Sequence, residues 1–131
     1  MENYEINVKI ILSGLWTAVM FCFAYADILA HMRSDIIEGI LAGELGGIQL
    51  TQEALLGSAV LMVVPILMIF LSLALKDKIN RWLNIILGAV YTVVNLATML
   101  MTGGGLGYFY VFAIVEVVFS AMIVWYAWKW K

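Results

Sequence analysis

Residues 54–75 read ALLGSAVLMVVPILMIFLSLAL, a stretch that contains no Asp, Glu, Lys or Arg. A hydrocarbon core of roughly 30 Å is crossed by about 20 apolar residues of α-helix, because each residue advances the helix by about 1.5 Å. The stretch therefore predicts a membrane-spanning helix. Pro65 lies inside it, a position that a membrane bundle tolerates because neighbouring groups satisfy the freed backbone carbonyl.

Three further stretches have this length and apolar character, at residues 10–32, 82–102 and 108–128. Hydrophobic residues make up 65% of the 131-residue chain and charged residues only 12%, and the mean hydropathy is +1.03. A soluble domain usually has about a quarter of its residues charged, and a core of this size cannot hide so much apolar surface. The sequence predicts an all-α integral membrane four-helix bundle, a single domain over residues 1–131, with the lipid bilayer as its surroundings.

Two connections between the predicted spans are short, residues 76–81 and residues 102–107, and the second carries no charge. Short connections predict that the second, third and fourth spans are antiparallel neighbours. Asn80 is the expected N-cap of the third span, since an Asn side chain accepts hydrogen bonds from the first free N–H groups of a helix.

The connection over residues 33–53 is longer and patterned. Asp35 and Glu38 have the spacing of a capping box, and the glycine pair at 46–47 is an expected helix stop. Between them, apolar residues recur at helical spacing: Ile36, Ile37, Ile40, Leu41 and Leu45. This pattern predicts a short amphipathic helix between the first two spans, at the membrane surface or over the mouth of the bundle, where it either serves function or only packs.

Basic residues are distributed unevenly between the two ends of the predicted bundle. Only Arg33 falls at the end where the first span finishes. The others fall at the opposite end: Lys9, Lys76, Lys78, Arg81, Lys129 and Lys131. Because loops rich in Lys and Arg stay on the cytoplasmic side, both termini are predicted to be cytoplasmic.

Two acidic residues lie within the predicted spans, where a charged side chain costs several kcal/mol unless it has partners. Glu116 falls near the middle of the fourth span, and Asp27 in the outer third of the first, with His31 one turn further on. Polar stripes on the helices place Asn95 and Tyr91 near them. The candidate substrate- or ion-binding residues are therefore Glu116, Asp27, Asn95, Tyr91 and His31. Helix packing through hydrogen bonds is the alternative role for each of them.

Other chemistries have little support in the sequence. One histidine and one cysteine give no metal site of conventional spacing, and no serine has a histidine at compatible depth for nucleophilic catalysis. No cofactor is expected. The net charge of −2 and the absence of a basic run argue against nucleic acid as a partner.

Three segments carry a resemblance to a known family. They read KINRWLNIILGAVYT at 78–92, IVWYAWKW at 123–130 and MFCFAYAD at 20–27. The chain resembles an uncharacterised family of short bacterial four-span membrane proteins that has only a domain-of-unknown-function label, which implies a bacterial plasma membrane. In size and span number it is also similar to small multidrug-resistance transporters and to DoxX-like proteins. The former carry their essential glutamate in the first span, whereas here the central acid is in the fourth.

Three functions remain open from the sequence. The first is a small transporter or channel for an ion or small molecule, homo-oligomeric because four helices make a thin wall, with a buried acidic site at Glu116. The second is a non-catalytic subunit or stabiliser of a larger membrane complex. The third is a membrane-embedded enzyme acting on a lipid or quinone, with Asp27 and Glu116 as an acid–base pair.

Overall fold

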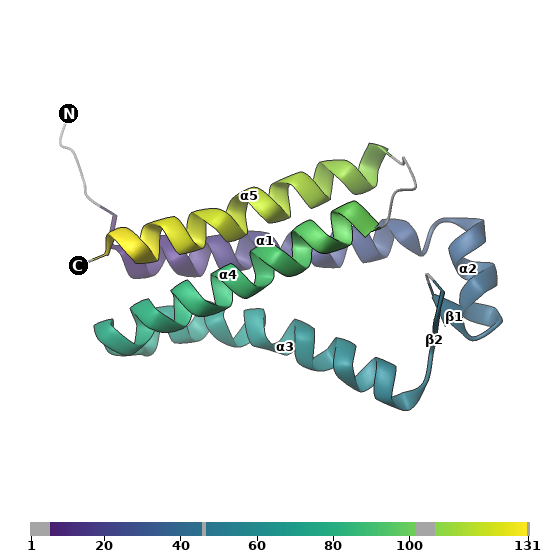
Figure 1. The fold of residues 1–131 in the computed structure, drawn as a ribbon, viewed down its shortest axis with the longest axis horizontal. Helices are drawn as coiled ribbons and strands as arrows, with labels where there is room; N and C mark the ends of the chain where they lie inside the picture. The colour runs from purple at the N-terminus through teal and green to yellow at the C-terminus, as the bar shows by residue number, and fades with distance from the viewer. Residues whose placement is uncertain (1–5, 46, 102–106, 131) are drawn as a thin grey trace.

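A computed structural model describes residues 6–45, 47–101 and 107–130 of the chain (Figure 1). Four long helices run through it: α1 (Val8–Ala30), α3 (Gln52–Ala74), α4 (Asp77–Met101) and α5 (Gly107–Lys129). Each is long and apolar enough to cross a membrane. The predicted all-α architecture with four spans is confirmed.

The four long helices are not equally close to one another. α1 packs against both α3 and α5, and α4 packs along α5 (Figure 1). α3 and α4 meet near the short turn that joins them and then diverge. The third and fourth spans are therefore close neighbours as predicted, whereas the second and third contact each other over only a small part of their length, because a short turn fixes only the helix ends. α3 lies mainly along α1, where the Ser13 hydroxyl donates to the Ile69 carbonyl at 2.8 Å.

The core of the bundle lies where α1, α4 and α5 meet one end of α3. Trp16 and Tyr91 form its centre, with their rings edge to face and 5.7 Å apart. The remaining buried apolar members are Leu12, Leu15, Val19, Met68, Ile123 and Ala127. Large apolar side chains elsewhere point outward, as Phe70 and Val93 do with 67% of each exposed. Such a surface suits hydrocarbon rather than water.

The start of α4 differs from the prediction. The helix begins at Asp77, so Asn80 lies within its first turn and is not an N-cap. The Asn80 side chain is fully buried, and its Nδ2 donates to the Ser72 carbonyl at 2.7 Å. The polar run at 76–81 is thus mostly helix, and its amide turns inward to satisfy a carbonyl of the last turn of α3.

The segment between α1 and α3 contains the predicted short helix, α2 (Ser34–Leu41). It is followed by a hairpin that was not predicted, in which β1 (Glu44–Leu45) pairs antiparallel with β2 (Ile48–Gln49). Gly43 and Gly47 adopt φ values of +84° and +82°, a region that L side chains rarely adopt. α2 ends at Leu41, before the glycine pair at 46–47 that was predicted to end it. Gly46 lies outside the described residues.

The predicted capping box at the start of α2 is also wrong. The N-cap is Arg33, and its side chain makes no capping hydrogen bond. Instead, Arg33 Nη2 forms an ion pair with Asp35 Oδ2 at 2.6 Å, and its Nη1 donates to the Tyr108 hydroxyl at 3.3 Å. The hydrogen bonds from Arg33 lower the pKa of the Asp35 carboxyl below its ordinary value. Arg33 thereby connects α2 to the beginning of α5.

The start of α1 and the end of α5 lie at the same end of the bundle as the α3–α4 turn (Figure 1). We call this the terminal end, and we call the end that carries α2 and the hairpin the distal end.

Candidate functional site

A cavity of about 190 Å³ lies between the four long helices in the distal half of the bundle. Its walls are mainly apolar, but five polar or acidic side chains line it: Asp27, Tyr91, Asn95, Thr98 and Glu116. We call it the acidic cavity. Leu61 and Met62 close it on the α3 side, where α3 diverges from α4. The sequence did not predict that α3 and α4 diverge, and this divergence makes room for the acidic cavity.

Glu116 enters the acidic cavity from the middle of α5. It lies nine residues from the start of that helix at Gly107, which is about 13 Å at helical rise. The residue is half-buried, and the side chains of Asn95 and Tyr91 donate to other acceptors rather than to its carboxyl group. Its backbone carbonyl accepts from the Ser120 hydroxyl at 2.6 Å. The carboxyl group is therefore available to a ligand or a proton.

Asp27 lines the acidic cavity from the last turn of α1. His31 follows one turn later, and its Nδ1 lies 2.6 Å from the backbone carbonyl of Asp27. The imidazole is close enough to interact electrostatically with the Asp27 carboxyl, but His31 is exposed and does not line the cavity. If Asp27 and Glu116 were both ionised, they would repel each other across the cavity.

Asn95 and Tyr91 are held by hydrogen bonds to neighbouring helices. Asn95 Nδ2 donates to the Ser120 hydroxyl at 2.9 Å, so it links α4 to α5 beside Glu116. The Tyr91 hydroxyl donates to the Leu61 carbonyl and links α4 to α3. In the described part of the chain, neither side chain forms the hydrogen bond to Glu116 that pure helix packing predicts.

The structure therefore brings four of the five predicted site residues to one cavity, and His31 lies beside it. A second polar cluster was missed by the sequence. Trp16 Nε1 donates to Asn84 Oδ1 at 2.8 Å, and Asn84 Nδ2 donates to Asn80 Oδ1 at 2.7 Å. The sequence features that could have indicated this cluster are a tryptophan, Trp16, within the first span and two asparagines, Asn80 and Asn84, one helical turn apart.

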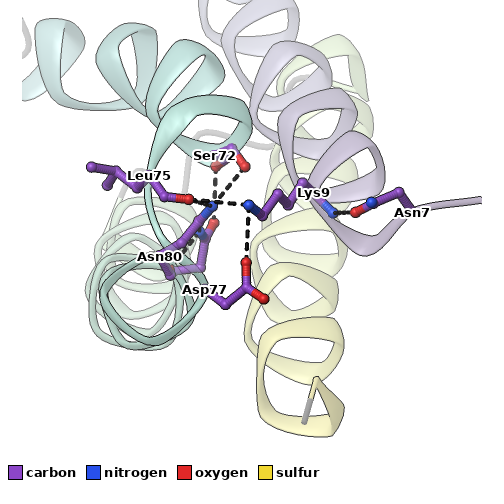
Figure 2. A network of polar contacts seen from close by, with 7 residues as sticks. Asn7, Lys9, Ser72, Leu75, Asp77 and Asn80 are labelled. Atoms are coloured by element: carbon purple, nitrogen blue, oxygen red, sulfur yellow. Dashed lines mark hydrogen bonds and ion pairs between the residues drawn. The ribbon is translucent and has the colours of Figure 1, made fainter.

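The terminal end of the bundle is closed by a polar network around Lys9, which Figure 2 shows. Lys9 Nζ reaches from α1 to Asp77 Oδ1 at 2.9 Å and to the Leu75 carbonyl at 3.2 Å. Asn80 donates to carbonyls of the same turn. These contacts tie α1 to the α3–α4 turn, so the bundle is bound together at the terminal end and open around a cavity at the distal end.

The chemistry of the acidic cavity follows from its lining. Two carboxyl groups, a phenol and an amide within apolar walls can bind a cation or exchange a proton. No Lys or Arg lines the cavity. Over the described ranges, no group of three or more His, Cys, Asp and Glu side chains is arranged to hold a metal ion.

No curated protein and no solved structure matches this chain. A family model does match it, over residues 1–131, and the family is described only as one of unknown function. The four apolar helices agree with the four-span architecture that the resemblance implied. The chain is a small membrane protein and belongs to the family of unknown function DUF6326.

Proposed function

We propose that this protein is a small transporter or channel whose acidic cavity binds a small cation, with Glu116 as the ionisable centre. The observation that carries the proposal is that carboxyl groups from two helices, Asp27 of α1 and Glu116 of α5, line one cavity among membrane-spanning helices. A carboxyl group at this depth is costly unless something compensates for it. A bound cation or proton provides that compensation.

The surroundings of the two carboxyl groups support this proposal over a packing role. A packing role for Glu116 calls for a fixed hydrogen-bond donor such as Asn95 or Tyr91, and both of these side chains donate elsewhere: Asn95 to Ser120 and Tyr91 to Leu61. The acidic cavity also has no basic lining residue. A cation that enters the cavity would therefore meet two carboxyl groups and no basic lining side chain.

The size of the acidic cavity restricts what it accepts. At about 190 Å³ it is smaller than the roughly 300–1,000 Å³ of pockets for drug-sized ligands. A water molecule occupies roughly 30 Å³ in the liquid, so the cavity has room for roughly six waters or for a small ion with part of its shell. The proposed ligand is a proton, an alkali cation or a small amine.

The asymmetry of the bundle supports movement of that ligand across the membrane. The ion pair of Lys9 with Asp77 ties α1 to the α3–α4 turn at the terminal end, whereas the acidic cavity occupies the distal half. We further propose that the protein works as a homo-oligomer in a bacterial plasma membrane with both termini cytoplasmic, because the basic residues gather at the terminal end.

Electrophysiology on a solid-supported membrane tests the proposal. The full chain is reconstituted in liposomes and exposed to concentration jumps of H⁺, Na⁺, K⁺ and methylammonium. We expect a transient current for at least one of these cations, and a loss of at least tenfold in Glu116→Gln, which removes the charge at nearly constant volume. Glu53→Gln is the matched control, because it makes the same change at an exposed residue in the first turn of α3 that does not line the cavity.

Two results would overturn the transport proposal. One is the absence of current from the wild-type protein with every cation, which favours the non-catalytic subunit instead. The other is equal current from Glu116→Gln and wild type, which would mean that Glu116 is not the ionisable centre. The shared cavity also meets the geometric requirement of the third hypothesis, an acid–base pair acting on a lipid or quinone. That function would be seen as product formation from membrane extracts, lost in both Glu116→Gln and Asp27→Asn.

A further inference from the structure

A second cavity, of about 360 Å³, lies at the terminal end of the bundle and is lined by Asp77, Lys78, Arg81, Trp82 and Trp130. We propose that it binds the phosphate-bearing headgroup of an anionic phospholipid. We call it the basic pocket. It is separate from the acidic cavity, with which it shares no lining residue, and the proposal does not depend on transport.

The charge of the basic pocket favours an anion. Its one acid, Asp77, is already paired with Lys9 at 2.9 Å. Within the described ranges, neither Lys78 nor Arg81 forms an ion pair. Among the described residues, the two cationic side chains that line the pocket therefore have no ion-pair partner, and the one lining carboxylate is paired with Lys9.

Arg81 is held in place for binding. Its Nε and Nη2 donate to the Ala127 and Trp128 carbonyls at 3.0 and 3.1 Å, so the end of α5 fixes the guanidinium group. A guanidinium group carries five N–H donors, and these two bonds leave three for another acceptor. Planar paired donors of this kind suit the oxygens of a phosphate group.

The first turn of α4 adds to the attraction. The first N–H groups of a helix have no partner within that helix, and they carry the positive end of its dipole. α4 begins at Asp77, and Lys78 and Arg81 lie in its first two turns. The free N–H groups and the two cationic side chains thus belong to the same few residues.

The tryptophans favour a lipid over free phosphate. Tryptophan concentrates at membrane–water interfaces, where its ring meets both headgroups and acyl chains. Trp82 is 47% exposed, and Trp130 is half-buried against the apolar core at the end of α5. A phosphate group at Lys78 and Arg81 would have its glycerol and upper acyl carbons beside these rings. Basic pockets between spans are suited to such headgroups.

Native mass spectrometry of the full chain in detergent micelles tests this inference. The protein is titrated with phosphatidylglycerol and, separately, with phosphatidylcholine. We expect phosphatidylglycerol to bind at least tenfold more tightly, and Lys78→Gln to weaken its binding about fivefold, since one basic residue near the surface contributes roughly that factor. Lys76→Gln is the matched control, because Lys76 is exposed two residues earlier and does not line the pocket.

A third titration, with inorganic phosphate, distinguishes a site for a lipid headgroup from a site for free phosphate. Millimolar phosphate should leave the bound phosphatidylglycerol in place. Displacement by phosphate would overturn the lipid assignment. Equal binding of the two lipids, or equal losses in Lys78→Gln and Lys76→Gln, would overturn the site itself, because either result would reduce it to general surface charge.

Discussion

Single side chains explain why this bundle has one specific packing although most of its surface is apolar. Apolar contacts alone do not fix the rotation of a helix in lipid, whereas buried hydrogen bonds do, since each leaves an unsatisfied group if it is broken. Trp16, Asn84 and Asn80 form such a chain between α1 and α4. Among the described residues, every buried polar side-chain atom has a hydrogen-bond partner.

At the same scale, the sequence predicted the candidate site better than it predicted the polar cluster. Glu116 and Asp27 were identified because a charged side chain within a membrane span is energetically costly unless it has partners. Asn95 and Tyr91 were placed near them by the polar stripe of the third span. His31 was included only for its spacing from Asp27. It lies outside the cavity because α1 ends at Ala30, so His31 is already the C-cap residue and not part of the helix face that lines the cavity.

Gly88 allows a prediction at residue scale. A Cβ atom there would lie 2.9 Å from Val124 Cγ2 and 3.0 Å from Ile123 Cγ2. Both neighbours are β-branched and stiff. We expect Gly88→Ala to force α4 from α5 and to destabilise the protein by about 1–3 kcal/mol relative to Gly57→Ala. Thermal unfolding in detergent, followed by tryptophan fluorescence, measures the difference.

Gly57→Ala is the appropriate reference for that comparison. Gly57 also lies inside a long helix, and a Cβ atom there would meet nothing within 4 Å. Both variants gain the same helix propensity, so the difference between them isolates the contact with α5. Equal midpoints for the two variants would show that α4 and α5 are not as close at Gly88 as the structure places them.

At the scale of elements, hydropathy predicted the four long helices, whose length is set by the thickness of the bilayer. It did not predict the features that depend on local contacts. The four spans were located to within a few residues, apart from the start of α4. Its polar first turn was taken for a loop, although helices continue into the interface when their polar groups find partners, as Asn80 does with Ser72. The β1–β2 hairpin was missed because strands of two residues show no alternation.

Arg33 gives a prediction for the α2 element. It is the described side chain that links α2 to α5, through Asp35 and Tyr108. We expect Arg33→Gln to lower the hydrogen-exchange protection of residues 34–41 several-fold and to leave α4 unchanged. Because the pKa of Asp35 is lowered by Arg33, the link is fully formed above the ordinary pKa of an aspartate and weakens only as the pH falls below it. The loss should therefore be the same at pH 6 and pH 8.

The control for this prediction is Glu38→Gln, which also removes a charge from α2 but at an exposed residue. Its protection should match that of the wild type. If Arg33→Gln left the protection of residues 34–41 unaltered, α2 would be held by the hairpin alone.

At the scale of the whole molecule, the two ends of the bundle have different chemistry. The terminal end combines the Lys9 network with the basic pocket, and the distal half holds the acidic cavity. The outer surface between them is apolar. The orientation of the protein in the membrane therefore determines in which leaflet the basic pocket lies and which side of the membrane is nearer to the acidic cavity.

Cysteine labelling measures that orientation. Cys22 is the single cysteine and is buried, so Cys22→Ser provides a background for Lys76→Cys and, separately, Glu53→Cys. Both residues are exposed and lie at opposite ends of α3. We expect a membrane-impermeant maleimide to label Glu53→Cys in intact cells, and Lys76→Cys only after permeabilisation, because most of the basic residues lie at the terminal end.

Each alternative labelling pattern has a distinct structural meaning. The reverse pattern would invert the protein and would place the basic pocket in the leaflet opposite the cytoplasmic one, away from the negative surface potential of the cytoplasmic leaflet that would attract its basic side chains. Labelling of both cysteines from the same side would mean that α3 does not cross the bilayer. The acidic cavity needs α3 as its fourth wall, through Leu61 and Met62, so that result would also remove the four-helix site from which transport is proposed.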